Sequence, residues 1–134
     1  MTNRTHQGRC LCGQTRFEIQ EPVIRSVHCH CESCRRHSSA PFMTMVGVED
    51  GQWRWTGAAP ALYRSSSGVE RQFCGTCGAP MSFRSVHLTG KIHFPLPAFE
   101  DPEAFPPEQH GFVAEKLGWV HLADGLPQNH GNTP

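Results

Sequence analysis

The chain has 134 residues and a mass of 14.9 kDa, so we expect one domain, residues 1–134. Its 13 glycines and 11 prolines favour a turn-rich fold over a helical bundle. Twelve basic and twelve acidic residues cancel, which argues against the cationic surface of a nucleic-acid-binding protein. No apolar run approaches the roughly 18 residues that span a bilayer, and the N-terminal residues lack the apolar segment of a secretory signal. We therefore expect a soluble, cytoplasmic protein that binds neither nucleic acid nor membrane.

Segments with alternating polar and apolar residues predict short strands along most of the chain. The longest would place the alternate residues Phe42, Thr44, Val46 and Val48 on one face. Glycine and proline separate the segments, so the expected fold class is all-β, a single small domain of short antiparallel sheets with very little helix. The predicted strands are 16–20, 24–28, 42–48, 52–56, 62–65, 69–73, 81–84 and 92–94.

Evidence for helices is thin. Residues 101–105 predict one helical turn, which the prolines at 106 and 107 would end. From Leu126 onward the chain is rich in glycine, asparagine and proline, so we expect a core from about residue 8 to 127 and a frayed tail over 128–134.

Seven cysteines and nine histidines are unusual for a chain of this size. The cysteines occur in three tight groups, and spacings of one or two residues are typical of metal ligands, because a short turn lets two sulfurs meet one ion. An odd count without an export signal argues against structural disulfides. The groups are Cys10 with Cys12, Cys29 with Cys31 and Cys34, and Cys74 with Cys77.

The two cysteine pairs together supply the four ligands of a closed tetrahedral zinc site. Glycines follow Cys12, Cys74 and Cys77, and their conformational freedom would let the backbone fold tightly around an ion. We expect this zinc to be structural, because four thiolates leave no coordination position open.

The remaining group, Cys29, Cys31 and Cys34, has the three ligands of a catalytic zinc whose fourth position is exchangeable. A histidine could instead close the tetrahedron; His28, His30 and His37 are near enough in sequence. Three thiolates weaken zinc as a Lewis acid and favour a soft fourth ligand, such as the thiolate of a substrate. The open form of this site therefore predicts thiol chemistry.

Three arginines are candidates for binding a carboxylate of such a substrate: Arg35, Arg36 and Arg71. Each could alternatively be solvated or bind a backbone carbonyl. The histidines near the central cysteines could donate hydrogen bonds to thiolates, or be ordinary polar loop residues. The tryptophans Trp53, Trp55 and Trp119 are expected in the core or in an interface.

Five blocks of the sequence together resemble the glutathione-dependent formaldehyde-activating enzyme family, which also contains the centromere protein V domain. The blocks are 8–13 (GRCLCG), 28–36 (HCHCESCRR), 63–66 (YRSS), 71–78 (RQFCGTCG) and 119–127 (WVHLADGLP). The resemblance implies a β-tent fold, one four-cysteine structural zinc, and a three-cysteine zinc at which glutathione binds.

The resemblance also implies an activity, the condensation of glutathione with formaldehyde to S-(hydroxymethyl)glutathione, classed in reverse as a carbon–sulfur lyase. We therefore expect a carbon–sulfur lyase-type enzyme with two zinc ions per chain, in which Cys29, Cys31 and Cys34 hold the catalytic ion. The centromere relative implies the alternative, a non-catalytic zinc-binding module for partner recognition.

Overall fold

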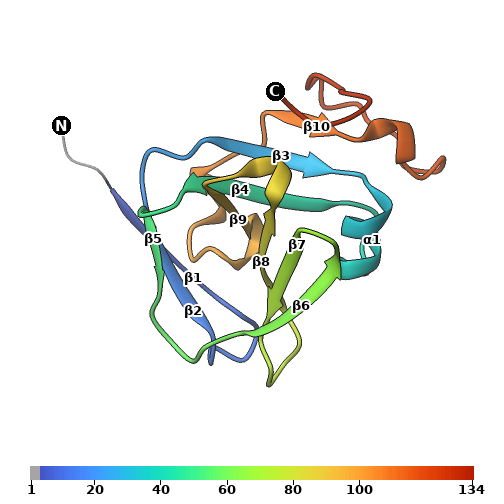
Figure 1. Ribbon diagram of the computed structural model, residues 1–134. Helices are drawn as coiled ribbons and strands as arrows, with labels where there is room; N and C mark the ends of the chain where they lie inside the picture. The colour runs from blue at the N-terminus through green and yellow to red at the C-terminus, as the bar shows by residue number, and fades with distance from the viewer. Residues whose placement is uncertain (1–3) are drawn as a thin grey trace.

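The computed structural model describes residues 4–134, in which ten strands form two sheets (Figure 1). The smaller sheet has the order β1-β2-β5, and the larger has the order β10-β3-β4-β9-β8-β7-β6. The strands of the smaller sheet are β1 (Thr5–Arg9), β2 (Arg16–Gln20) and β5 (Trp53–Trp55). Those of the larger sheet are β3 (Arg25–Cys29), β4 (Met43–Glu49), β6 (Ala61–Ser66), β7 (Val69–Phe73), β8 (Pro80–Ser85), β9 (Lys91–Pro95) and β10 (Gln109–Gly111).

Helical structure is confined to short elements in the described chain. One α-helix, α1 (Glu32–Ser38), follows β3. The expected turn near residue 101 is present as η3 (Pro102–Ala104), and three further 3₁₀ turns are η1 (Val86–Leu88), η2 (Leu96–Ala98) and η4 (Val113–Glu115). The all-β fold class is thus confirmed. No helix in residues 4–134 is long and apolar enough to cross a membrane.

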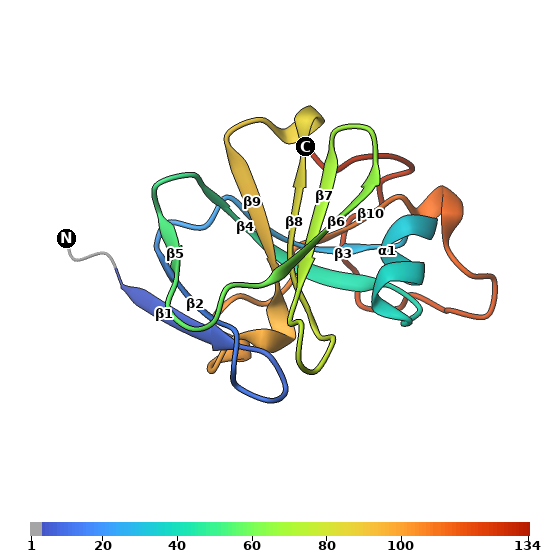
Figure 2. The same ribbon diagram turned by 60° about the horizontal axis from the view of Figure 1, so that its bottom comes forward.

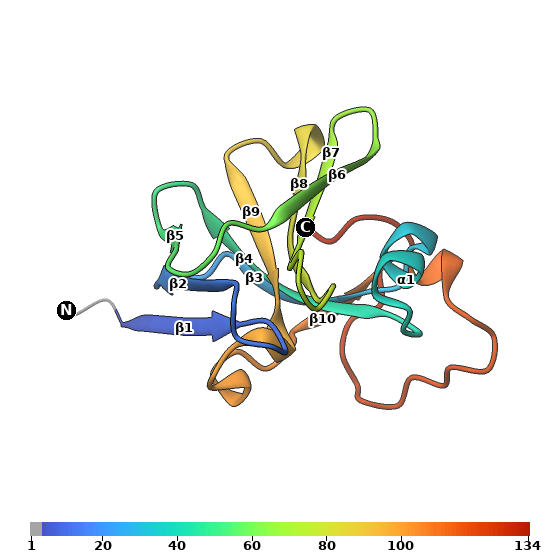
Figure 3. The same cartoon turned by 90° about the horizontal axis from the view of Figure 1, so that it is seen from below.

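The main core lies between the two sheets, which Figure 3 shows from below. Phe17 of the small sheet stacks on Phe94 of the large one with ring centroids 4.3 Å apart, and Phe99 meets Phe17 edge-on. Trp53 and Trp55 pack against this cluster as predicted, whereas Trp119 is 67% exposed. Trp119 is therefore not part of the core, and its alternative place in an interface stays a prediction.

Strand β4 is buried on both faces. Val46 and Val48, which the alternation places on one face, join the main core. Met43 and Met45 point the other way and pack with Cys29 and the rest of a second buried cluster. The central cysteines therefore lie on the face of the large sheet opposite the main core.

The C-terminal segment is not frayed. Its backbone hydrogen-bonds to β10 and the residues after it: His110 N–H donates to the carbonyl of Pro127, and Phe112 N–H donates to that of Gly131. Thr133 is buried near the end of the chain. The prediction of a frayed tail over 128–134 is wrong, because the backbone of this segment hydrogen-bonds to an edge strand, a pairing that composition does not reveal.

Candidate metal centres

The four-cysteine cluster forms where two turns meet. Cys10 and Cys12 lie in the β1–β2 turn, while Cys74 and Cys77 lie in the β7–β8 turn. The sulfurs of Cys10 and Cys12 are 3.6 Å apart, those of Cys12 and Cys74 are 3.7 Å apart, and all four lie within 4.8 Å of one another. Zinc–sulfur bonds of about 2.3 Å in a tetrahedron separate the sulfurs by roughly 3.8 Å. The donor set thus fits a tetrahedral ion.

Backbone amides of the same turns point at these sulfurs. Thr15 N–H donates to Cys10 Sγ at 3.3 Å, and the amides of Thr76 and Cys77 donate to Cys74 Sγ at 3.4 Å. Such hydrogen bonds favour the thiolate. The Cys77 amide is the largest cause that lowers the pKa of Cys74 to about 5. The backbone of the two turns therefore stabilises anionic sulfurs even without a metal ion.

This cluster links the two sheets, because one turn belongs to the small sheet and the other to the large sheet. Figure 2 shows the two turns side by side, in agreement with the contact between Cys12 and Cys74. An ion held here would connect sequence positions 62 residues apart.

The three-cysteine cluster lies where β3 leads into α1. Cys29 ends β3, Cys31 caps the helix, and Cys34 lies in its first turn. Cys34 N–H donates to Cys31 Sγ at 3.3 Å, so the cap itself presents a sulfur, and the three sulfurs lie within 4.8 Å of one another. The sequence does not predict this helix, because residues 32–38 (ESCRRHS) have no apolar periodicity and the N-cap is a cysteine.

The three thiols strongly affect one another's protonation. Hydrogen bonds from Cys29 and Cys34, followed by the Cys34 amide and the charge of Arg71, lower the pKa of Cys31 to about 2. Hydrogen bonds with Cys31 and Cys34 raise the pKa of the Cys29 thiol, and burial raises it further. Three crowded thiols cannot all ionise without a cation between them. The donor set is therefore that of a soft divalent ion such as zinc.

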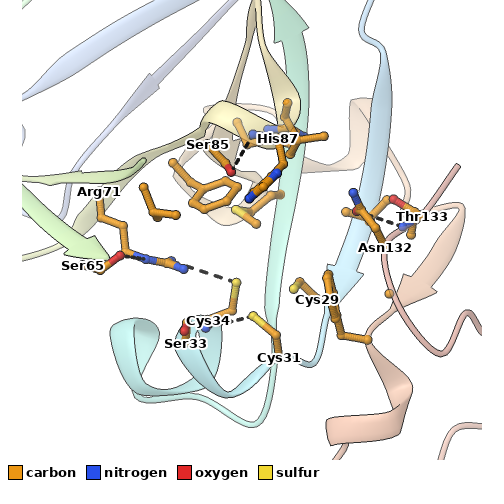
Figure 4. Close-up of a pocket in the computed structure, with 18 of the residues that line it drawn as sticks. Cys29, Cys31, Ser33, Cys34, Ser65, Arg71, Ser85, His87, Asn132 and Thr133 are labelled. Atoms are coloured by element: carbon orange, nitrogen blue, oxygen red, sulfur yellow. Dashed lines mark hydrogen bonds between the residues drawn. The ribbon is translucent and has the colours of Figure 1, made fainter. Parts of the chain in front are cut away.

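A cavity of about 440 Å³ opens beside these sulfurs (Figure 4). Arg71 reaches into it and is 3% exposed, with Nη1 4.0 Å from Cys34 Sγ and the guanidinium 4.9 Å from the Phe83 ring centroid. Its Nε donates to Ser65 Oγ at 3.3 Å. No carboxylate in residues 4–134 forms an ion pair with Arg71. Its positive charge therefore faces the sulfurs.

The other two candidate arginines lie elsewhere. Arg35 Nε donates to the carbonyl of His30 at 3.3 Å. Arg35 therefore binds a backbone carbonyl, the alternative to binding a substrate carboxylate. Arg36 is exposed on α1 and pairs with Glu32 one turn earlier, at 2.7 Å. Neither residue lines the cavity. The sequence could not separate these three arginines, because it does not show which way each one points.

Among the described residues, no histidine nitrogen lies within 4.8 Å of all three sulfurs. His28 alternates with Cys29 along β3 and faces away from it. His30 Nε2 lies 2.9 Å from His110 Nδ1, and His110 Nε2 donates to Asp124 Oδ2 at 2.8 Å. His37 is likewise outside the group, and burial lowers its pKa. His110, which the sequence left unassigned, thus joins the loop of the central cysteines to the C-terminal segment.

Several cavity-lining residues carried no separate signal in the sequence. Ser65, His87, Asn132 and Thr133 surround the space in Figure 4, and they come from three distant parts of the chain. Ser65 belonged to a block that carries the family resemblance, whereas Asn132 and Thr133 lay in the segment predicted to fray.

Together, fold and clusters define a small two-sheet protein with one four-cysteine cluster between its sheets and one three-cysteine cluster at a cavity. The chain belongs to the glutathione-dependent formaldehyde-activating enzyme family, whose family model matches residues 5–115. Over 88 residues it is 35% identical to an uncharacterized lyase of Schizosaccharomyces pombe, a match that covers 64% of this chain and 61% of that relative. A crystal structure of a Rhodobacter sphaeroides protein shares the fold, with a TM-score of 0.60 and 18% identity, covering 92% of this chain and 98% of that chain.

Proposed function

We propose that this protein is a zinc-dependent carbon–sulfur lyase-type enzyme that acts on a thiol adduct. The proposed activity is that of an S-(hydroxymethyl)glutathione synthase-like enzyme. It joins glutathione to formaldehyde, and the reaction also runs in reverse. Family membership supports the class of reaction, and the fission-yeast relative carries the name lyase. The proposal includes two zinc ions, a structural one on the four-cysteine cluster and a catalytic one on Cys29, Cys31 and Cys34.

The observation that carries the proposal is the position of the three sulfurs on the wall of a cavity. No histidine nitrogen of the described residues is grouped with them, which favours an open fourth position. When bound, zinc would supply a cation that lowers the pKa of an incoming thiol and orients its sulfur.

The chain's own residues have separate roles in this proposal. Arg71 offsets the excess negative charge of the three thiolates and keeps the cavity attractive to an anionic sulfur. Phe83 and Met45 line the cavity with apolar surface that excludes water from the reacting atoms. In the forward direction, a carbon–sulfur bond forms between the thiol sulfur and the aldehyde carbon. The thiol proton ends on the aldehyde oxygen, so atoms balance without an oxidant or reductant.

Calorimetry of glutathione binding to the zinc-loaded protein tests the thiol site. In buffers of different ionisation enthalpy, we expect about one proton released per site near neutral pH. NMR exchange spectroscopy then measures whether the protein accelerates interconversion of formaldehyde with its glutathione adduct. The variant Cys34→Ala serves as control and should bind no glutathione while it remains folded.

Two results would change the proposal. Thiol binding without acceleration would keep the metal site and move the substrate to another thiol adduct. Absence of thiol binding, with a histidine found as fourth ligand, would overturn the enzyme proposal in favour of a non-catalytic zinc-binding module.

A further inference from the structure

A row of residues crosses the large sheet on the face that carries the cavity. The strand registers pair Arg71 with Phe83, Phe83 with His93, His93 with Gly47, and Gly47 with Arg25. Residues directly opposite one another in neighbouring strands share a face. All but Gly47 line the cavity. The two arginines therefore lie at opposite ends of this row, four strand spacings or about 19 Å apart when followed along the sheet.

Arg25 is largely unsatisfied by the protein. A guanidinium has five N–H donors, and among the described residues that of Arg25 makes one hydrogen bond, from Nη1 to Thr133 Oγ1 at 3.0 Å. Its Nε is buried without a partner, and burial lowers the pKa of Arg25. No ion pair of the described chain includes Arg25. Half-buried cations normally have a counter-charge, so the free N–H donors of Arg25 favour the binding of an anion.

The cavity borders Arg25, and its lining adds little negative charge. Opposite Arg25, the ring of His93 covers Gly47, where a Cβ would lie 2.7 Å from His93 Nε2. His93 is neutral near pH 7, because burial and then the charge of Arg25 lower its pKa to about 4. Glu115 is the one acidic residue among those that line the cavity, and its Oε1 accepts the Glu32 amide.

The spacing along β3 places this donor set at a defined distance from the sulfurs. Arg25, Val27 and Cys29 alternate onto the same face, and all three line the cavity. A rise of roughly 3.3 Å per residue separates Arg25 from Cys29 by about 13 Å, with apolar Val27 between them. In Figure 4, Thr133, which holds Arg25, lies on the side of the cavity opposite Arg71.

We propose that Arg25, oriented by Thr133, is a carboxylate-binding subsite at the end of the cavity far from the three cysteines. The ligand class is then an elongated thiol whose sulfur reaches the cysteine cluster while a carboxylate about 10 Å away pairs with Arg25. This inference rests on the proposed function for the thiol end, and glutathione is one member of the class. It also assigns the C-terminal segment a part in ligand recognition.

Matched thiols of one length test the subsite. We would measure binding of mercaptooctanoic acid and mercaptooctanol to the zinc-loaded protein by calorimetry. The wild type should prefer the acid about tenfold or more, because an ion-paired hydrogen bond is lost in the alcohol. Arg25→Gln should abolish that preference, Arg25→Lys should keep part of it, and Thr133→Val should reduce it. The control Arg54→Gln alters an exposed arginine on the small sheet and should leave the preference unchanged.

A second readout separates this inference from the thiol site. Octanoate, which has no thiol, should shift the NMR resonance of the Arg25 Nε–H group, whereas octanol should not. If neither mercaptan binds but octanoate shifts this resonance, the proposed thiol site fails and the carboxylate subsite stands. If the preference survives in folded Arg25→Gln, or if acid and alcohol behave alike in both measurements, the subsite is overturned.

Discussion

At the scale of single residues, the cavity is defined by charges that the protein leaves unpaired. Arg71 is buried beside sulfurs and lacks a carboxylate partner in the described chain. A buried cation without compensation is costly, and the charge of Arg71 favours the thiolate form of Cys31 by lowering its pKa. Arg71 and the three cysteines therefore form one electrostatic unit.

Replacing Arg71 with Met should keep the packing against Phe83 but remove the charge beside the cysteines. The three-cysteine site should then retain zinc about tenfold less tightly, since an excess negative charge is no longer offset. Competition with a metal chelator measures this affinity. Arg36→Met is the matched control, because Arg36 is exposed and pairs with Glu32. Equal zinc retention by Arg71→Met and the wild type would contradict the role of Arg71.

His93 should make stability depend on pH. Its pKa in the folded protein, about 4, lies below the value near 6.5 of an unfolded histidine, so protonation favours unfolding. The stabilisation should be complete above pH 6.5, fall as the pH drops from 6.5 to 4, and amount to about 3 kcal/mol.

Denaturant unfolding of the wild type and His93→Gln across this pH range measures the dependence. The difference in unfolding free energy between the two proteins should shrink toward acid pH. His121→Gln, at an exposed histidine, should show no such trend. A difference that stays constant from pH 7 to pH 4 would refute the assignment.

At the scale of elements, the sequence predicts strands where polar and apolar residues alternate. It does not predict strands or helices that lack this alternation. The inward residues of β1 are His6 and Gly8, so its alternation carries no apolar signal. Strand β10 is three residues long and depends on hydrogen bonds to the distant C-terminal segment. Helix α1 is missed because its cap and its buried residue are cysteines. The cysteine groups themselves were predictable, because ligand spacing is local, whereas the cavity depends on strand register.

Gly8→Ala tests why β1 has a glycine at its centre. A Cβ at this position would lie 2.2 Å from Phe17 Cζ, and Phe17 is fully buried between several aromatic rings. Overpacking of this kind costs about 2 kcal/mol. Thermal or denaturant unfolding measures the loss. Gly118→Ala is the matched control, because a Cβ there meets nothing within 4 Å. If both variants unfold alike, the close contact with Phe17 does not constrain β1.

At the scale of the whole molecule, the two clusters differ in what they hold together. The four-cysteine cluster connects the turns of two different sheets, and Cys10 and Cys74 belong to the main core. The three-cysteine cluster joins only neighbouring residues of β3 and α1. Under the proposed zinc loading, loss of an ion from the four-cysteine cluster should affect folding, and loss of one from the three-cysteine cluster should affect ligand binding.

Cys74→Ala and Cys34→Ala measure this difference. We expect Cys74→Ala to unfold or to be strongly destabilised, because binding of a structural zinc contributes on the order of 10 kcal/mol to folding. Cys34→Ala should remain folded and lose one equivalent of zinc. Circular dichroism with elemental analysis distinguishes the two cases, and equal thermal destabilisation would contradict the division.

The packed C-terminal segment has a practical consequence for anyone who purifies this protein. Asn132 and Thr133 line the cavity, so any polypeptide fused after Pro134 starts one residue from its wall. Such a tag, and a polyhistidine one above all, would compete for the metal and obstruct the ligand. β1 begins on the other side of the molecule from β10 (Figure 1). Affinity tags therefore belong at the N-terminus in every experiment that measures zinc or thiol binding.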